Sequence, residues 1–399
     1  MVLIIYMLDI LVVGSGPSGS TVATKLSEYG YKVAIVEEHV SVGLPVQCTG
    51  LISPETTTVS HYKGHILNTI YGANIYSPSL KKYEFSAPVA KAVVIDRRDY
   101  DRFLINEASK KGVEILLQHK FISYQIEGKN IISKIKTNEG LIEIKSKILV
   151  GADGFGSTVR KRAKIPGPKE MLSAYEMEVS TKELDRKKVE VYFGNNIAPS
   201  FFGWVVPAEN FYRIGIAALT SNYNAFYYFK KFKKAFMHTH NLKERDIKDL
   251  SIITGGIPIG IMKSFAYKNI VLVGDAASTI KPLSGGGIYY GIISSIVASK
   301  YISEAIDSDD LNKLKMYEKI WYSSYGKEIK KGYSLRKIFK SLTDNDLENF
   351  LKLLNDENLI KIITDGNIDR PSELAKLLIK KFPAIAKMLL PKIKSIYLS

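Results

Sequence analysis

Aliphatic runs alternate with segments of helical periodicity in the first 160 residues of this 399-residue chain. Residues 8–13 and 32–36 are short, nearly continuous aliphatic runs, which is typical of strands buried in a parallel sheet. Residues 20–30 between them carry apolar side chains at helical spacing and end in glycine. The pattern predicts a strand–helix–strand unit, followed by a β-rich stretch over residues 120–148.

The middle of the chain follows a different pattern, in which apolar and polar positions alternate. We expect an antiparallel sheet here, which forms the pocket for a substrate. A basic, aromatic-rich helix is predicted at 223–241, and from residue 311 onward the pattern is helical. The alternation predicts strands at 172–181, 188–193, 202–207 and 213–219.

A glycine-rich turn joins the first predicted strand to the first helix. Gly14 allows a tight turn, Gly16 lets the backbone approach a pyrophosphate, and Gly19 lets the helix pack on the strand. The acid at the end of the second strand, Glu37, can accept a hydrogen bond from a ribose hydroxyl, and Glu38 is a less favoured alternative. The pattern favours a dinucleotide site and leaves FAD and NAD open. Its candidate residues are Gly14, Ser15, Gly16, Pro17, Ser18, Gly19, Glu37 and Glu38.

Two later strands also end in small or acidic residues. Residues 147–151 run into Ala-Asp-Gly-Phe-Gly-Ser, and residues 270–274 run into Asp275. In an open parallel sheet, ligands lie at this carboxyl edge, so Asp275 can accept a bond from a polyol hydroxyl. Gly285, Gly286 and Gly287 precede another predicted helix, where free backbone amides can face a ring or a phosphate.

Together these motifs resemble the flavin monooxygenase-like superfamily, which binds FAD on a Rossmann-like domain of the glutathione-reductase type. The resemblance rests on the N-terminal glycine turn with Glu37, the Gly-Ala-Asp-Gly segment at 151–154 and the Gly-Asp-Ala-Ala segment at 274–277. It implies that the first glycines lie at the pyrophosphate and Glu37 at the adenosine ribose. It also implies FAD contacts from Arg97 or Arg98, Gly274, Asp275, Gly285, Gly286, Gly287 and Ile288.

Three further segments are similar to the geranylgeranyl reductase family, especially the archaeal digeranylgeranylglycerophospholipid reductases. They are a Pro-x-x-Cys-x-Gly loop at 45–50, the Phe-x-Trp-x-Val-Pro run at 202–207, and the Lys-Pro-Leu-Ser-Gly-Gly-Gly-Ile-Tyr-Tyr run at 281–290. In the family signature, tyrosine stands at the position of Phe202 and phenylalanine at that of Val206. The resemblance implies that reduced FAD hydrogenates C=C bonds of geranylgeranyl chains in archaeal-type membrane lipids.

The same resemblance gives four residues a role in the reaction. Cys48 is expected above the flavin, where it positions or protonates the substrate, although a lone cysteine is more often inert packing. Trp204 and Phe202 are expected to form a wall of an apolar substrate tunnel, with ordinary core packing as the alternative. Tyr289 is a candidate for a proton relay or a ring contact.

Charge and composition limit the classes of binding partner that we expect for this chain. The formal net charge is +16, which suggests a polyanionic neighbour. Nucleic acid is not expected because no zinc, helix-turn-helix or RNA-recognition pattern is present. A single cysteine excludes a cysteine-based metal site. No secretory signal is evident, so we expect a cytoplasmic protein.

The C-terminal segment has apolar residues at helical spacing with lysines between them. The apolar positions are Leu374, Leu377, Leu378, Ile385, Met388 and Leu389. Such a segment can lie on the inner face of an anionic membrane or dock on the protein with a solvated basic face, and both interpretations stay open. The expected reductant is NAD(P)H or ferredoxin. Because no second dinucleotide motif is evident, NAD(P)H as the reductant is expected to bind transiently or without a recognisable fold.

We therefore predict an α/β (α+β) fold with a discontinuous FAD-binding domain at 1–165 and 263–310. An antiparallel-sheet substrate domain is predicted at 166–262 and a helical C-terminal region at 311–399. An FAD-dependent hydroxylase or halogenase of the same superfamily is the alternative function, since a tryptophan before x-x-Pro also occurs in halogenases.

Overall fold

The computed structural model describes residues 4–220 and 224–381, together with 387, 390, 391 and 396. Its first sheet has a parallel core in which the aliphatic runs are buried; Ile10, Leu11 and Val12 at its centre are wholly enclosed. Three further strands pair antiparallel at its margins: β9 (Lys120–Glu127), β10 (Asn130–Thr137) and β17 (Ala266–Tyr267). The parallel strands, in spatial order, are β8 (Glu114–Leu117), β2 (Val33–Glu37), β1 (Ile4–Val13), β11 (Gly140–Gly151) and β18 (Ile270–Leu272).

This strand order brings distant segments to one edge. Because β1, β2, β11 and β18 are parallel, Gly14, Glu37, Asp153 and Asp275 all lie at or just beyond the carboxyl ends of adjacent strands. That edge is where open α/β sheets bind ligands. The Rossmann-like arrangement predicted from the sequence is confirmed.

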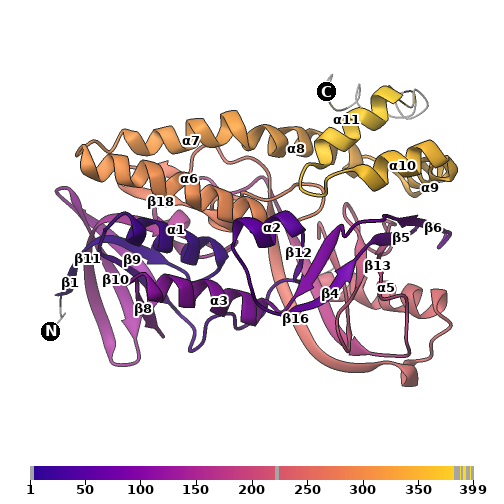
Figure 1. Ribbon diagram of the computed structural model, residues 1–399, viewed down its shortest axis with the longest axis horizontal. Helices are drawn as coiled ribbons and strands as arrows, with labels where there is room; N and C mark the ends of the chain where they lie inside the picture. The colour runs from indigo at the N-terminus through magenta and orange to yellow at the C-terminus, as the bar shows by residue number, and fades with distance from the viewer. Residues whose placement is uncertain (1–3, 221–223, 382–386, 388–389, 392–395, 397–399) are drawn as a thin grey trace.

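Helices cover this sheet and extend away from it (Figure 1). Helix α1 packs against both α3 and α6, and α6 is followed by α7, which runs alongside it. Short helices α2 and α4 follow loops at the carboxyl edge. Their bounds are α1 Pro17–Glu28, α2 Pro54–Val59, α3 Arg97–Lys110, α4 Thr158–Arg162, α6 Ile288–Asp307 and α7 Lys313–Ser324.

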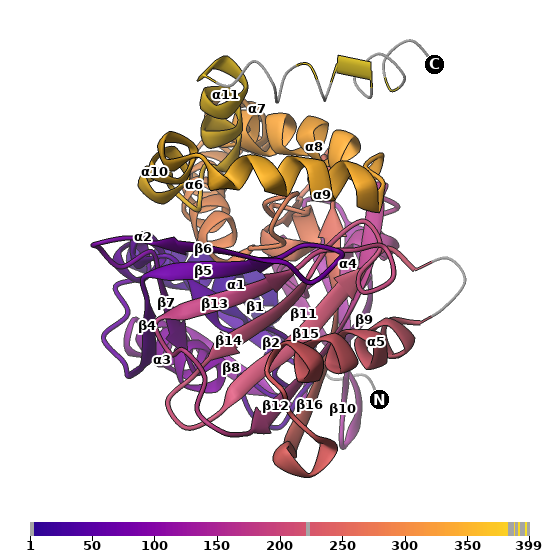
Figure 2. The same cartoon turned by 90° about the vertical axis from the view of Figure 1, so that its right-hand side faces the viewer.

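A seven-stranded sheet faces the carboxyl edge, with α5 (Ala225–Thr239) on its outer side (Figure 2). Successive side chains along a strand point to opposite faces of the sheet. On the outer face, Met177, Val179 and Val205 pack toward the phenylalanines of α5. All its strand pairs are antiparallel except β13–β5. In spatial order the strands are β16 (Lys248–Ile259), β12 (Glu170–Ser180), β15 (Tyr212–Ala218), β14 (Gly203–Pro207), β13 (Lys188–Tyr192), β5 (Gly72–Tyr76) and β6 (Lys82–Ser86).

Two strands of this second sheet come from the N-terminal part of the chain. Residues 72–86 fall within the range predicted for the FAD-binding domain, yet β5 and β6 extend the substrate sheet because β5 pairs in parallel with β13. A small sheet of β3 (Leu51–Ile52), β7 (Ala92–Ile95) and β4 (Ile66–Ile70) links the two parts. The chain therefore crosses between the two sheets more than once.

The C-terminal helices lie over the second sheet (Figure 2). Leu374 and Leu378 of α11 pack in a cluster with Tyr83 and Phe85 of β6, whereas Leu377 is exposed. Of the predicted apolar positions, Ile385, Met388 and Leu389 lie outside the described residues. No described helix combines the length and apolar character needed to cross a bilayer. The helices are α8 (Gly326–Lys340), α9 (Asp344–Lys352), α10 (Glu357–Asp365) and α11 (Pro371–Lys381).

Candidate active site

A cavity of about 880 Å³ lies between the carboxyl edge of the parallel sheet and the inner face of the seven-stranded sheet. Most of the residues singled out from the sequence line it. Gly19, Arg98, Gly274 and Tyr289 do not, and Arg98 instead pairs with Asp96. The lining includes Gly14, Ser15, Gly16, Pro17, Ser18, Glu37, Glu38, Cys48, Arg97, Phe202, Trp204, Asp275, Gly285, Gly286, Gly287 and Ile288.

The three glycines of the first turn differ in what surrounds them. Gly14 has a φ of +100°, and a Cβ on it would lie 2.5 Å from the Ala152 carbonyl oxygen. A Cβ on Gly19 would lie 1.9 Å from the Gly14 carbonyl oxygen. Gly16 has nothing within 4 Å of that position, and it begins α1, whose start has neither a side-chain cap nor an acidic residue. The turn thus presents an open, positively polarised helix start to the cavity.

Glu37 is held by donors from two neighbouring segments. Its Oε2 accepts from the Ser15 amide at 3.0 Å and the Ser15 hydroxyl at 2.7 Å, and its Oε1 accepts from the His39 amide at 3.0 Å. Burial would raise the pKa of Glu37, but these hydrogen bonds keep it below its ordinary value. Glu37 is therefore a carboxylate fixed at the edge of the cavity. Glu38 instead forms an ion pair with Lys120 at 2.6 Å.

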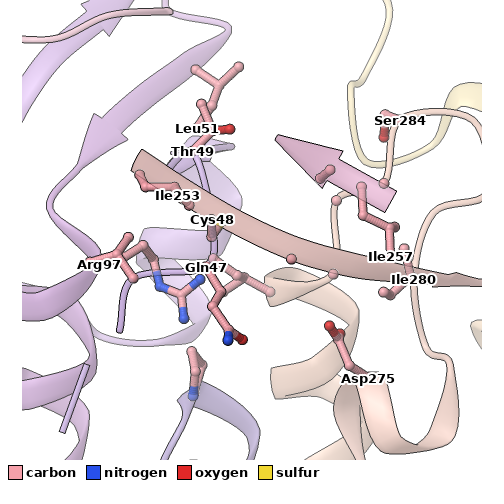
Figure 3. Close-up of a pocket in the computed structure, with 18 of the residues that line it drawn as sticks. Gln47, Cys48, Thr49, Leu51, Arg97, Ile253, Ile257, Asp275, Ile280 and Ser284 are labelled. Atoms are coloured by element: carbon pink, nitrogen blue, oxygen red, sulfur yellow. The ribbon is translucent and has the colours of Figure 1, made fainter. Parts of the chain in front are cut away.

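Arg97 and Asp275 supply charge to the middle of the cavity. The Arg97 guanidinium forms two hydrogen bonds to Asp101, at 3.0 and 2.9 Å. Burial would lower the pKa of Arg97, but Asp101 and Cys48 hold it above its usual range. Burial raises the pKa of Asp275 to about 6, and the Arg97 charge acts in the opposite direction. In Figure 3 the guanidinium points toward Gln47, with Asp275 beyond it.

The loop before α6 brings backbone donors to the same region. Gly287 precedes the helix without a side-chain cap, and a Cβ on it would lie 2.9 Å from Asp275 Oδ1. A Cβ on Gly286 would lie 2.6 Å from Lys281 Cε. Gly274 lies behind the cavity wall, because a Cβ there would be 2.3 Å from Ser18 Oγ. Its contribution is to pack α1 close to the parallel sheet.

The side of the cavity nearest the second sheet is apolar. Phe202 stacks on Phe201 with ring centroids 4.2 Å apart and lies edge-on to Trp204 at 6.3 Å. Isoleucine side chains of β16, of the end of α10 and of the loop after it complete this wall. Its apolar members are Ile70, Ile75, Phe85, Val189, Val191, Phe201, Phe202, Trp204, Val206, Ile253, Ile257, Ile280, Ile363 and Ile368.

A buried carboxyl group, that of Glu176, stands in the apolar wall, and it was not among the residues predicted from the sequence. Glu176 of β12 is 2% exposed, and its Oε2 accepts from Trp204 Nε1 at 2.6 Å and from the Thr49 hydroxyl. Burial raises the pKa of Glu176 to about 7, despite these donors and the nearby Arg213. The available signal was period-two alternation, which puts Glu176 on the same face as Leu172 and Ala174.

Tyr289 lies outside the lining of the cavity. The Tyr289 hydroxyl donates to Glu55 at 2.9 Å, and burial with this carboxylate raises the pKa of Tyr289 to about 12. Its predicted part in the reaction stays a prediction, and this geometry adds no support to it.

Residues 363–368 line the cavity and are held by Lys281, whose Nζ donates to Asp369 at 2.7 Å and to the Ile368 carbonyl at 3.1 Å.

These residues fit an FAD. An uncapped helix start with open space at Gly16 suits a pyrophosphate, Glu37 suits a ribose, and Asp275 with the uncapped start of α6 suits the ribityl–flavin end. The adjoining apolar compartment suits an uncharged, apolar part of a substrate. Fold and site together define an FAD-dependent oxidoreductase.

Comparison with known proteins agrees with this class. Residues 7–320 match the FAD-binding domain family, and the chain belongs to that family, with FAD as its cofactor. It is 31% identical over 382 residues to an uncharacterized protein of Methanocaldococcus jannaschii, covering 93% of this chain and 95% of that one. It is 29% identical over 389 residues to the digeranylgeranylglycerophospholipid reductase of the same organism, covering 95% and 96%.

A solved structure agrees over nearly the whole chain. A geranylgeranyl bacteriochlorophyll reductase-like protein from Thermoplasma acidophilum superposes with a TM-score of 0.83 at 25% identity, covering 97% of this chain and 99% of that one. The resemblance to geranylgeranyl reductases inferred from the sequence is thus confirmed.

Proposed function

We propose that this oxidoreductase hydrogenates C=C bonds of geranylgeranyl chains in archaeal-type membrane lipids. The proposal rests on one observation: a site suited to FAD is continuous with a compartment lined by isoleucine, valine and aromatic side chains. The names of the similar reductases point to the same substrate class.

An isolated alkene offers no charge or hydrogen-bonding group, so its position must come from shape and apolar contact. The stacked Phe201 and Phe202 and the indole of Trp204 provide a rigid wall for a chain of isoprene units. The isoleucines of β16 and of residues 363–368 also line this compartment. When bound and reduced, FAD supplies a hydride from N5.

Cys48 lies where the two compartments meet. The Gly50 amide donates to its Sγ at 3.4 Å, and Arg97 interacts with it electrostatically. We propose that the thiol contacts the substrate and helps to fix the double bond relative to the cofactor. The immediate donor of electrons is NAD(P)H or ferredoxin, and a peripheral contact with anionic lipid brings the enzyme to its substrate.

The test is an anaerobic incubation of the FAD-loaded protein with dithionite and a geranylgeranyl ether phospholipid, followed by mass spectrometry of the lipid. We expect mass gains in steps of two hydrogens, with none from dithionite and FAD alone. A gain of one oxygen in air, without hydrogenation under anaerobic conditions, would transfer the protein to the hydroxylase alternative. No change in either condition would withdraw the proposed substrate.

A further inference from the structure

The carboxyl group of Glu176 is an unusual component of an apolar wall. It projects from the central part of β12 and is almost fully enclosed. Its Oε2 is bonded to Trp204 and Thr49, while its Oε1 has no hydrogen-bond partner among the described residues. Burying a carboxylate oxygen without a partner is unfavourable, so a protonated carboxyl is better suited to this position than an ionised one.

The charged groups around Glu176 largely offset one another. Arg213 of β15 favours its ionised form, and Glu178 on the same strand disfavours it. Arg213 pairs with Glu178 at 3.1 Å, and within the described part of the chain Glu176 has no ion-pair partner of its own. Since burial raises the pKa of Glu176 to about 7, the group can both hold and release a proton near neutral pH.

Thr49 connects this carboxyl group to the cavity. It lines the cavity next to Cys48, and its hydroxyl is within hydrogen-bond reach of Glu176. The backbone of the loop is fixed there because Arg213 Nη1 donates to the Thr49 carbonyl oxygen at 2.6 Å. Figure 3 shows Thr49 and Cys48 adjacent on this loop, beside Ile253 of β16. The hydroxyl is thus held between the buried acid and the apolar compartment.

We propose that Thr49 protonates the alkene and that Glu176 resupplies its proton, an inference that rests on the proposed reductase function. One alkene carbon gains the hydride, and the other forms a C–H bond with the Thr49 hydroxyl proton as the π bond breaks. When Glu176 is protonated on Oε2, the hydrogen bond between Glu176 and Thr49 is reversed: Oε2 donates to Thr49 Oγ1, and the Thr49 hydroxyl proton is free to face the alkene. The Glu176 carboxyl proton moves to Thr49 Oγ1 in the same step, which leaves a carboxylate. That carboxylate regains a proton from solvent after the product leaves.

A merely structural role for Glu176 would require no proton. Glutamine has the same shape and can accept the same hydrogen bonds from Trp204 and Thr49, but it cannot release a proton at any accessible pH. Glu176→Gln therefore separates proton supply from positioning. Thr49→Val removes the hydroxyl, and Thr49→Ser retains it.

The first measurement is the rate of hydrogenation by dithionite-reduced, FAD-loaded protein between pH 5 and 9. We expect the wild-type rate to fall above about pH 7, and Glu176→Gln and Thr49→Val to lose about a hundredfold at pH 6 and to show no such fall. Thr49→Ser and Glu176→Asp should recover part of the rate. Wild-type rates and pH profiles in both Glu176→Gln and Thr49→Val would overturn the inference while leaving the reductase function intact.

The second measurement needs neither FAD nor substrate. In a Trp321→Phe background, Trp204 is the remaining tryptophan, so its fluorescence reports the ionisation of the carboxyl to which it donates. We expect a transition centred near pH 7 that disappears in Glu176→Gln. Glu178→Gln, two residues along the same strand, should retain a transition, centred at a lower pH because Glu178 disfavours the ionised form of Glu176. Absence of a transition between pH 5 and 9, or its persistence in Glu176→Gln, would overturn the assignment.

The two measurements together separate the claims. If wild-type protein fails to hydrogenate any geranylgeranyl lipid, the proposed function fails, whatever the fluorescence shows. If hydrogenation proceeds but the variants behave as wild type, the proton route through Thr49 fails and the function stands.

Discussion

The turn after β1 and the wall beneath the second sheet face the same cavity but are held in different ways. At the turn, Ser15 and Glu37 are 22 residues apart and belong to one strand–helix–strand unit. In the wall, Thr49 and Glu176 are 127 residues apart, and Lys281 and Asp369 are 88 apart. The contacts suited to the pyrophosphate and the adenosine ribose therefore come from one local unit, whereas the substrate side forms only after distant segments have come together.

This difference separates two tasks. A dinucleotide presents fixed phosphates and hydroxyls, which a turn, a helix start and one carboxylate can recognise. An isoprenoid chain must be enclosed, and enclosure requires walls from β5, β14, β16 and residues 363–368 at once. We expect perturbations of long-range contacts to disable the substrate side while FAD binding persists.

The largest effect is expected at the buried ion pair that holds residues 363–369. Lys281→Met leaves Asp369, which is 2% exposed, without its cation, and loss of one partner from a buried pair costs about 3–5 kcal/mol. Urea denaturation at pH 7 measures the loss. The double variant Lys281→Met/Asp369→Leu should recover most of it. A change below about 1 kcal/mol in the single variant would show that the pair does not secure the segment.

The next effect concerns the pH dependence of stability. Burial raises the pKa of Glu176 from 4.5 to about 7, so ionising this group favours the unfolded chain. The contribution is absent below about pH 4.5 and complete above about pH 7. Relative to wild type, Glu176→Gln should gain stability on the order of 3 kcal/mol as pH rises through this window.

Thermal or urea unfolding at pH 5 and pH 8 checks that shift. Glu178→Gln is the matched control, since Glu178 accepts from both Arg213 and Ser251 and is only partly buried. A parallel change in Glu176→Gln and wild type at both pH values would contradict the prediction.

A paired substitution separates packing from FAD contact in the first turn. Gly19→Ala places a Cβ against the Gly14 carbonyl and should destabilise the apoprotein by about 1–3 kcal/mol. Gly16→Ala meets nothing within 4 Å and should leave the apoprotein stable, yet block the approach of a pyrophosphate. Unfolding of the apoprotein and titration with FAD report the two effects. Normal FAD affinity in Gly16→Ala would show that the FAD pyrophosphate does not bind at this turn.

The smallest effect is expected at the C-terminus. Truncation after Lys381 keeps Leu374 and Leu378 in their cluster but removes three lysines and no acidic residue. We expect sedimentation with anionic vesicles at low salt to weaken by about fivefold for each of the three lysines that reaches the lipid, since one lysine contributes about 1 kcal/mol at a charged surface. Neutral vesicles are the control. Unchanged binding to anionic vesicles would favour the docked helix as the sole role of this region.

Part of the candidate site could be predicted because its residues follow strands directly. Glycines and acids placed immediately after aliphatic runs meet at one edge of a parallel sheet, and Gly14, Glu37 and Asp275 do so. Tyr289 was included by its neighbourhood in a motif, but its direction on α6 turns it toward Glu55. Periodicity did not place β5 and β6, since pairing partners of a strand are not encoded in its own alternation.

The sequence by itself determined the strand–glycine–helix unit, the acids at the carboxyl edge and the relation to FAD-binding proteins, because each depends on short spacings. The tertiary structure alone decided that β5 joins the second sheet, that residues 363–368 close the cavity, and that Glu176 faces Thr49 and Trp204. The physical reason is that all three features depend on contacts between residues far apart in the sequence, which local sequence does not fix. For Glu176, such contacts set its burial and its hydrogen bonds, and these determine whether the carboxyl group is protonated.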